Sequence, residues 1–317
     1  MGFEALLGND QLKENLISSL QKGHISHFYL LSGPKGSGKH TLARLMGAAI
    51  LCRGQNRPCF NCIACKKVMD GNHPDCIVVD NPEEKTVKVD LIREARQDMF
   101  VRPNESDYKI YIFPRAQDMR PEGQNALLKI LEEPPAYGVF LLLTDNPNKL
   151  LPTVRSRCTE LTLRPLPEKL LQNQLAARFP EADPEDLEAA VLRSGGFLGQ
   201  ALSLLEGGTA LEPQTEAFAE AFAQKNNLEL TRTLVPMEKL KRDPLCDLLQ
   251  QWQELMEEAL ICRSGVRTVS PLSRKLASAR SSTELYEAAE VLRKAADYLQ
   301  SNVSPAAVCG YLSWALR

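Results

Sequence analysis

The sequence predicts an α/β protein with a parallel sheet, followed by an all-helical C-terminal part. Three observations predict this class. Short apolar segments alternate with helical patterns over the first 166 residues, a glycine-rich loop joins the first of them to a helix, and strand patterns stop after Pro165. Short apolar strands that alternate with helices form a parallel sheet with helices on both faces.

Five apolar segments have the length and composition of buried strands. They are residues 27–32, 77–79, 110–113, 139–143 and 161–163. A helix with one apolar stripe follows the glycine-rich loop. A second helix is expected to be capped by Asp90. A third is expected to start at Pro121 and to stop at Glu132–Pro135, because proline ends a helix.

The character of the chain changes after Pro165. Residues 168–206 read as short helices with a break at Gly195-Gly196, and residues 207–213 read as a linker. The rest is helical, with apolar residues such as Leu285 and Leu292 on one face. At roughly 100–150 residues a domain, 317 residues allow two or three domains. We expect three, which cover residues 1–166, 167–208 and 209–317.

The composition is that of an ordinary globular chain, with 44% apolar and 25% charged residues. A net charge of −2 gives no global reason to bind nucleic acid or an anionic membrane. No apolar run approaches the ~18–20 residues that span a bilayer, and the N-terminus lacks a signal pattern. We therefore expect a cytoplasmic protein without a membrane partner. Its nine cysteines would stay reduced there, so clustered cysteines indicate a metal site rather than disulfides.

Residues 33–40 match the P-loop pattern G-x-x-x-x-G-K-[ST] except at the last position. In a P-loop, backbone N–H groups and a helix N-terminus face phosphate oxygens, and the lysine reaches the β- and γ-phosphates. The strand before the loop and the helix after it favour this interpretation over an ordinary glycine-rich turn. The nucleotide-binding residues would be Gly33, Gly36, Gly38 and Lys39.

Two positions that normally hold Mg²⁺ carry unsuitable side chains. His40 stands where a Ser or Thr hydroxyl would coordinate the metal, and Thr41 lies one position late and can compensate only in part. Arg115 occupies the place of an acidic pair after the strand at 110–113, and Asp118 lies past that place. Because Mg²⁺ prefers hard oxygen ligands, we expect no Mg²⁺ and no ATP hydrolysis here. Whether ATP still binds stays open.

Four cysteines have the spacing of a tetrahedral metal site, C-x₆-C-x₂-C-x₂-C. They are Cys52, Cys59, Cys62 and Cys65. Such thiolate sets hold structural Zn²⁺ and leave no open position for catalysis. The sequence leaves the fourth ligand open, because Cys76 or His73 could replace Cys52. The remaining cysteines are interpreted as small packing residues.

Several of these segments together resemble the bacterial DNA polymerase III clamp loader. The resemblance rests on residues 27–30, the loop at 33–40, the four cysteines, the segment Asn125–Pro135 and the tripeptide Ser156-Arg157-Cys158. It is strong over residues 3–166, weaker over the next forty, and only architectural beyond. It implies an AAA+ α/β module, a small helical lid and an α-helical collar that joins a pentameric loader.

Within that family, the resemblance points to the delta-prime type, the member that does not hydrolyse ATP. The active members keep a full P-loop, an acidic pair and an arginine at the position of Gly199, and this chain lacks all three. By itself, an arginine such as Arg157 is more often a surface ion-pair residue. The resemblance implies instead that Arg157 acts in trans, as an arginine finger on the ATP of a neighbouring subunit.

The implied partners are gamma/tau and delta subunits, and through the assembly a sliding clamp and primer-template DNA. The implied role is assistance in clamp loading during DNA replication. The first alternative is an ATP-hydrolysing gamma/tau-type subunit. A second is a zinc-dependent nucleic-acid-binding protein with a decayed P-loop, which would show salt-sensitive DNA binding, and a third is a P-loop kinase. Nucleotidyl transfer needs carboxylate pairs on metal ions, so that activity would belong to the complex.

Overall fold

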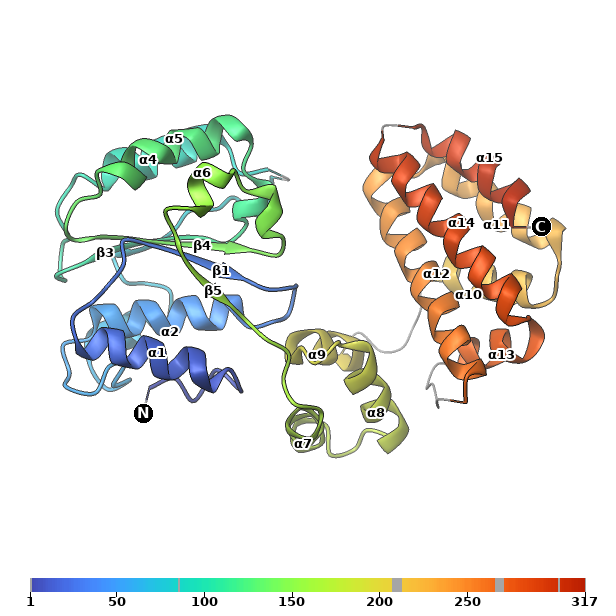
Figure 1. Ribbon diagram of the computed structural model, residues 1–317, viewed down its shortest axis with the longest axis horizontal. Helices are drawn as coiled ribbons and strands as arrows, with labels where there is room; N and C mark the ends of the chain where they lie inside the picture. Colours follow the sequence, from blue (N-terminus) through green and yellow to red (C-terminus); the bar gives the residue numbers. More distant parts are fainter. Residues whose placement is uncertain (1, 85, 207–212, 266–270, 302, 317) are drawn as a thin grey trace. The chain divides into compact units, whose positions relative to one another are not determined.

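The structure is a computed structural model that describes residues 2–84, 86–206, 213–265, 271–301 and 303–316. The chain forms two compact units (Figure 1). The first unit comprises residues 1–177 and 193–202, and the second comprises residues 178–192 and 203–317. The predicted linker lies outside the described residues except for its last residue, Pro213. The predicted division into three domains stays a prediction.

The first unit contains a five-stranded parallel sheet with the strand order β2-β3-β4-β1-β5. Its strands are β1 (Phe28–Ser32), β2 (Cys76–Val78), β3 (Lys109–Phe113), β4 (Gly138–Thr144) and β5 (Thr159–Thr162). The ends of each strand lie within two residues of the ends of a predicted segment, and no strand follows β5 in the described part of the chain. The predicted α/β class with a parallel sheet is therefore confirmed.

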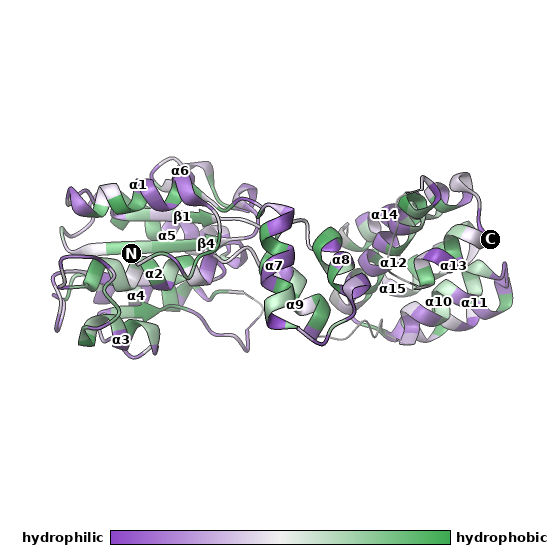
Figure 2. Ribbon diagram, turned by 90° about the horizontal axis from the view of Figure 1, so that it is seen from below, coloured by the Kyte–Doolittle hydropathy of each residue, from purple (hydrophilic) through white to green (hydrophobic). Residues whose placement is uncertain are grey.

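The three inner strands are buried over their whole length. Phe28 on β1 lies opposite Phe140 on β4 in the register, and their rings stack with centroids 4.5 Å apart. Figure 2 shows β4 mostly in the hydrophobic colour. A strand with helices on both faces must be apolar on both, which explains why the sequence shows continuous apolar runs here.

Helices cover both faces of this sheet (Figure 1). One face carries α1 (Asp10–Gln21) and α2 (Lys39–Leu51), and the other carries α4 (Val89–Asp98), α5 (Pro121–Glu132) and α6 (Pro152–Arg155). Each face has its own apolar core. Leu42 and Leu45 belong to the core beneath α2, and Ile92 and Leu127 belong to the core beneath α4 and α5.

Short elements connect these helices and strands. They are α3 (Ile63–Met69), η1 (Ala116–Asp118) and η2 (Pro147–Lys149). The helix predicted from Pro121 to Glu132 is confirmed. The prediction that Asp90 caps α4 is wrong, because Lys88 is the N-cap residue and Asp90 lies in the first turn. An acidic side chain there still faces the positive end of the helix dipole.

The two edge strands differ from the inner ones. On β5, Thr159, Glu160 and Thr162 are exposed. The Glu160 carboxylate accepts a hydrogen bond from the Ser32 hydroxyl at 3.3 Å and lies 3.7 Å from the Arg155 guanidinium. Strand β5 is therefore a polar edge whose acidic side chain is engaged locally.

Three short helices follow β5, as predicted. They are α7 (Glu168–Arg178), α8 (Pro184–Arg193) and α9 (Leu198–Glu206). Gly195 and Gly196 separate α8 from α9 with φ values of 56° and 85°. This left-handed backbone favours glycine, because in other residues the Cβ would come too close to the following carbonyl oxygen.

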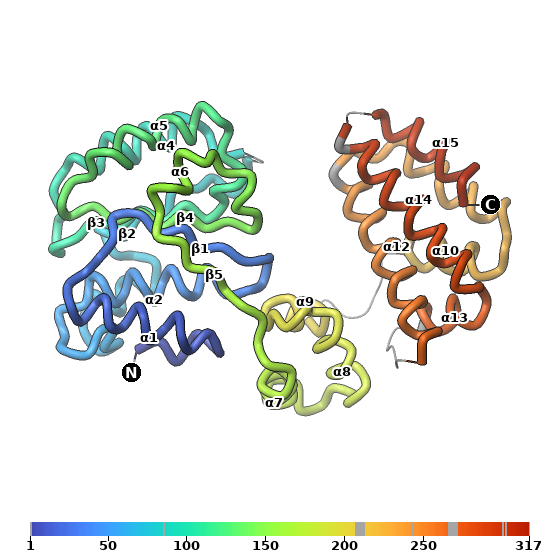
Figure 3. The backbone as a smooth tube through the Cα atoms, viewed as in Figure 1, coloured from blue at the N-terminus to red at the C-terminus, as the bar shows by residue number. Residues whose placement is uncertain are grey.

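The second unit is helical. Besides α8 it contains α10 (Pro213–Ala223), α11 (Asn227–Leu234), η3 (Val235–Lys239), α12 (Arg242–Arg263), α13 (Pro271–Ala279), α14 (Ser282–Gln300) and α15 (Pro305–Ala315). Figure 3 shows α14 running beside α12. The predicted apolar face is confirmed, because Leu285 and Leu292 are fully buried. At the centre of this core, Trp252 stacks on Phe218 with centroids 3.9 Å apart and donates to the Thr215 hydroxyl.

Candidate functional site

The glycine-rich loop connects the carboxyl end of β1 to the N-terminus of α2, the geometry that places backbone N–H groups toward an anion. Gly36 and Gly38 have φ values of 77° and 96°, so the loop needs glycine at both positions. Gly38 is the N-cap residue of α2, and Lys39 is its first residue. The predicted strand-loop-helix context of the P-loop is therefore present.

Lys39 is engaged within the chain. Its side chain is only 5% exposed, and its Nζ donates to the carbonyls of Gly33 at 2.5 Å and Pro34 at 2.9 Å. The same Nζ lies 2.5 Å from a carboxylate oxygen of Asp145, the residue after β4. The charge that would meet a phosphate is thus satisfied by the loop and by an acidic neighbour.

The first turn of α9 packs on the same loop. The Gly199 N–H donates to the Gly36 carbonyl at 2.9 Å. A Cβ added at Gly199 would lie 2.6 Å from the Gly36 Cα, and one added at Gly36 would lie 2.5 Å from the Gln200 nitrogen. Two glycines are therefore required for this backbone contact. From the sequence, Gly199 was identified as the position where active family members carry an arginine, but its packing against the loop was not predicted.

The two residues after the lysine are the candidates for the position that coordinates Mg²⁺ in a P-loop. His40 and Thr41 are both exposed at the start of α2. Partial desolvation, together with the charges of Lys39 and Arg44, lowers the pKa of His40. The imidazole is therefore neutral near pH 7, but it remains a nitrogen ligand where Mg²⁺ prefers oxygen.

Arg115 fills the position after β3 with an ion pair. Its Nε and NH2 groups donate to the Asp80 carboxylate at 2.6–3.2 Å. It also donates to the carbonyls of Glu84 and Asn81, both at 2.9 Å. Asp118 is more distant, with a carboxylate oxygen 4.0 Å from the guanidinium. The Arg115 guanidinium therefore forms an ion pair with the Asp80 carboxylate at this end of the sheet.

Four cysteine sulfurs gather at one point beside α2 and α3. Those of Cys52, Cys59, Cys62 and Cys65 all lie within 4.8 Å of one another. Cys52 follows the last residue of α2, and Cys62 is the N-cap residue of α3, so two helix ends bring the thiols together. Tetrahedral zinc with Zn–S bonds of about 2.3 Å needs sulfurs about 3.8 Å apart. The 4.0 Å between Cys52 and Cys62 is close to that value, and the group can bind a metal such as zinc.

The thiols in this group differ in acidity. Hydrogen bonds from the backbone of Cys62 and Asn61 and from the side chain of Cys52 lower the pKa of Cys59 to about 6. Burial raises the pKa of Cys65 and that of Cys52. A bound cation would favour the thiolate form of all four.

The two competing zinc ligands lie elsewhere. The Nδ1 of His73 accepts from the Asp75 N–H at 3.1 Å, and its Nε2 is 3.3 Å from the Ser106 hydroxyl. Both ring nitrogens thus have partners in the loop around Asp75. Cys76 opens β2, where burial raises its pKa to about 11, and it packs against Gly47. The geometry favours Cys52 as the fourth sulfur.

Arg157 lies between α6 and β5. Its NH1 donates to the Thr153 carbonyl at 3.0 Å, and its NH2 donates to the Glu132 carboxylate at 3.2 Å. The Arg157 side chain is 40% exposed. The neighbouring Cys158 points inward, since its thiol donates to the Val154 carbonyl and burial raises its pKa to about 12. Within the tripeptide, the Cys158 side chain therefore points inward, and the Arg157 side chain lies at the surface.

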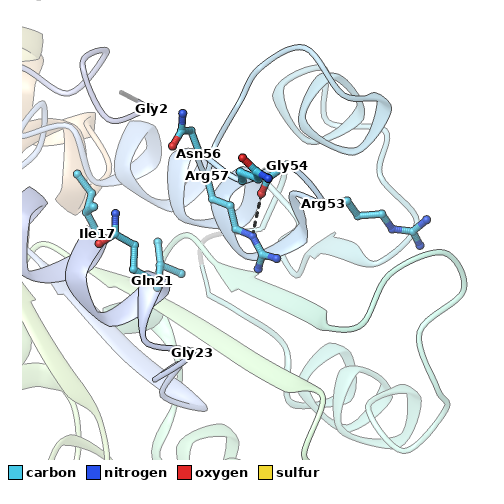
Figure 4. Close-up of a pocket in the computed structure, with 10 residues that line it drawn as sticks. Gly2, Ile17, Gln21, Gly23, Arg53, Gly54, Asn56 and Arg57 are labelled. Carbon is cyan, nitrogen blue, oxygen red and sulfur yellow. Dashed lines mark hydrogen bonds between the residues drawn. The ribbon is translucent and has the colours of Figure 1, made fainter.

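A separate cavity of about 630 Å³ lies between α1 and the segment after α2 (Figure 4). Its walls include Ile17, Gln21 and Asn56, and the Nε of Arg57 donates to the Gly54 carbonyl at 3.3 Å. No motif in the sequence marks this cavity.

None of the helices in the described ranges combines the length and the apolar character needed to cross a membrane.

The parallel sheet and its strand-loop-helix cradle define an α/β protein with a P-loop-like fold. The family model described as "DNA polymerase III, delta subunit" matches residues 8–167. The chain therefore belongs to the DNA polymerase III delta/delta-prime clamp-loader family, and the resemblance noted in the sequence is confirmed at that level.

Curated relatives include several DNA polymerase III subunits. Subunit delta-prime of Bacillus subtilis is 37% identical over 161 residues, which cover 50% of this chain and 49% of that protein. Subunit tau of the same organism is 31% identical over 210 residues, 64% of this chain and 37% of that protein. Subunit gamma/tau of Mycobacterium tuberculosis is 34% identical over 200 residues, 61% and 34%. The chain thus spans about a third to a half of the length of these relatives.

Solved structures align with this chain at low sequence identity. A DNA polymerase III gamma subunit-related protein from Thermotoga maritima aligns with a TM-score of 0.48 and 17% identity, over 97% of this chain and 99% of that one. A RuvB variant from Thermotoga maritima aligns with a TM-score of 0.44 and 14% identity, over 94% and 89%.

Proposed function

We propose that this protein is the delta-prime type subunit of a DNA polymerase III clamp loader, and that it does not hydrolyse ATP itself. In this proposal it assists the loading of a sliding clamp onto primed DNA. Its partners are gamma/tau and delta subunits in a hetero-pentamer, and it acts in the cytoplasm. Its catalytic contribution is Arg157, offered to the ATP of a neighbouring ATPase subunit.

The observation that carries the proposal is the ion pair between Arg115 and Asp80. A hydrolysing P-loop site needs a carboxylate at the end of β3 to orient Mg²⁺. Here a guanidinium takes that position and binds the adjacent carboxylate with two nitrogens. A fixed positive charge repels a divalent cation, so the chemistry of this site opposes metal-assisted hydrolysis. The burial of Lys39 against Asp145 supports the same conclusion.

The parts of the chain receive separate roles in this proposal. The sheet domain of residues 1–166 presents Arg157, residues 167–208 form a small helical lid, and residues 209–317 form the collar that joins the loader. The cysteine group holds structural Zn²⁺, which fixes α3 against the end of α2. A closed set of four thiolates leaves no position for substrate, so the metal would stabilise the domain without taking part in chemistry.

The test is ATP turnover by the purified chain and by a loader reconstituted with its partner subunits, clamp and primed DNA. The chain alone should show no turnover above background. Arg157→Ala should fold normally and lower the DNA-stimulated rate of the loader. The variant lacks the positive charge that would stabilise the transferring phosphoryl group. An unchanged rate in the reconstituted loader would exclude the finger role.

A gamma/tau-type ATPase is the second candidate, because relatives of that name match more of this chain than the delta-prime relative does. Turnover by the isolated chain that disappears in Lys39→Ala would establish this alternative. Mg²⁺-dependent ATP binding by the isolated chain would also favour it.

A further inference from the structure

The contact between Arg157 and Glu132 gives a role to the segment Asn125–Pro135, which the proposed function leaves unused. We propose that Glu132 is a positioning residue, which holds the Arg157 guanidinium in place for a nucleotide phosphate on a partner subunit. The inference rests on the proposed finger role of Arg157 and adds the residue that orients it.

Two elements hold the guanidinium from different sides. The Thr153 carbonyl, within α6, accepts from NH1, and Glu132, the last residue of α5, accepts from NH2. Bonds to two different nitrogens fix the plane of the group, whereas one bond would leave it free to rotate. A side chain that is already oriented loses less entropy when it meets its ligand.

The bonds to Thr153 and Glu132 leave some N–H donors of Arg157 for a ligand. An arginine side chain has five N–H donors, and the bonds described for Arg157 use two of them. Arg115 shows the contrasting arrangement in the same chain. Its Nε and NH2 both bind Asp80, and its side chain is 26% exposed against 40% for Arg157. Arg115 is thus held as a structural cation, while Arg157 keeps accessible donors.

The backbone on both sides of the contact is constrained. Helix α5 stops at Glu132 because Pro134 and Pro135 follow, and the Glu133 N–H still donates to the Lys129 carbonyl at 3.3 Å. The Arg157 N–H donates to the Val154 carbonyl at 3.2 Å. Glu132 is therefore carried by the end of α5, and Arg157 by a turn that is hydrogen-bonded to α6.

The neighbouring arginine is directed elsewhere. Arg155 donates to the Asn148 side-chain oxygen at 3.0 Å and lies 3.7 Å from the Glu160 carboxylate. Of these two arginines, Arg157 is the one that contacts the Glu132 carboxylate. The adjacent Glu133 is exposed as well, so it offers a matched control of the same charge.

The first experiment measures steady-state ATP turnover by the reconstituted loader with primed DNA. Glu132→Ala should lower the Arg157-dependent part of kcat about two- to fivefold, the range of an exposed ion pair. The KM for ATP should stay unchanged, because a neighbouring subunit binds the nucleotide. Glu132→Gln keeps an acceptor oxygen, so its kcat should lie between those of Glu132→Ala and the unmodified chain. Glu133→Ala should have the kcat of the unmodified chain. Circular dichroism melting of each variant checks its fold.

Combining Glu132→Ala with Arg157→Ala separates positioning from a general structural effect. The double variant should turn over at the rate of Arg157→Ala alone, since Glu132 acts only through that side chain. A further loss in the double variant, or a full rate in Glu132→Ala while Arg157→Ala is impaired, overturns the positioning role. An unchanged rate in Arg157→Ala overturns the finger role first, so the two failures are distinguishable.

A second measurement needs no partner. In the chain without its partners, ¹⁵N relaxation of the Arg157 side chain should report greater motion in Glu132→Ala than in Glu133→Ala. Equal motion in the two variants would show that Glu132 does not hold the guanidinium.

Discussion

Replacing Arg115 by methionine tests the ion pair at the end of β3. The change keeps most of the apolar stem and removes the charge and every donor. It leaves the Asp80 carboxylate, whose side chain is 15% exposed, without its cation, and two carbonyls without their donors. A hydrogen bond to a charged group contributes about 1.5–3 kcal/mol. Part is recovered from water at a partly exposed site, so we expect a loss of about 2–3 kcal/mol in the free energy of unfolding.

The matched control is Arg93→Met. Arg93 pairs with Asp90 at 3.3 Å, but their side chains are 60% and 79% exposed. Such pairs contribute about 0.2–1 kcal/mol, so this variant should change little. Asp80→Asn completes a double-mutant cycle with Arg115→Met, and the coupling should be about 1–3 kcal/mol.

The assay must report on the first unit. Both tryptophans, Trp252 and Trp314, lie in the second unit, so tryptophan fluorescence reports on that unit alone. Hydrogen exchange of the β3 amides, followed in urea, measures the opening of the sheet. If Arg115→Met and Arg93→Met lower the protection of β3 equally, the ion pair is not a significant contributor and the reasoning is refuted.

Three further changes have defined outcomes. Cys62→Ser should reduce bound zinc well below one ion per chain by elemental analysis and lower the melting temperature, whereas full metal content would exclude this thiol as a ligand. Gly199→Ala should destabilise the contact with Gly36, because the new Cβ would lie 2.6 Å from a backbone atom; faster exchange of the α9 amides checks this, and unchanged exchange contradicts it. Trp252→Ala should cost about 3–5 kcal/mol and unfold the second unit at lower urea, as circular dichroism can measure.

The sequence predicted what depends on local pattern. Continuous apolar runs located the three inner strands because a covered parallel sheet requires them, and shorter apolar segments located the edge strands. The spacing of Cys59, Cys62 and Cys65 predicted a cluster of thiols. Helix ends were less certain, as Asp90 shows, since aspartate is favoured both as an N-cap residue and in the first turn of a helix. The engagement of the P-loop lysine was not predicted, because Asp145 is more than a hundred residues away in the chain.

One pattern could have found some of these contacts. Asp80 and Asp145 each follow closely after a strand, and the carboxyl ends of parallel strands meet at one edge of a sheet. Acidic residues at such positions are expected to face the cations that lie there, Arg115 and Lys39. The partner of Arg157 has no comparable marker, because Glu132 reaches it from the end of a helix.

The polar outer strand β5 has a consequence for how such a protein can associate. An open sheet edge offers unpaired N–H and C=O groups to any extended chain, and apolar edges promote aggregation. Here Glu160 and two threonines line that edge, and the carboxylate is engaged by Arg155 and Ser32. Strand addition from a second copy would bring two such carboxylates close together. Association of two copies through this edge is thereby discouraged.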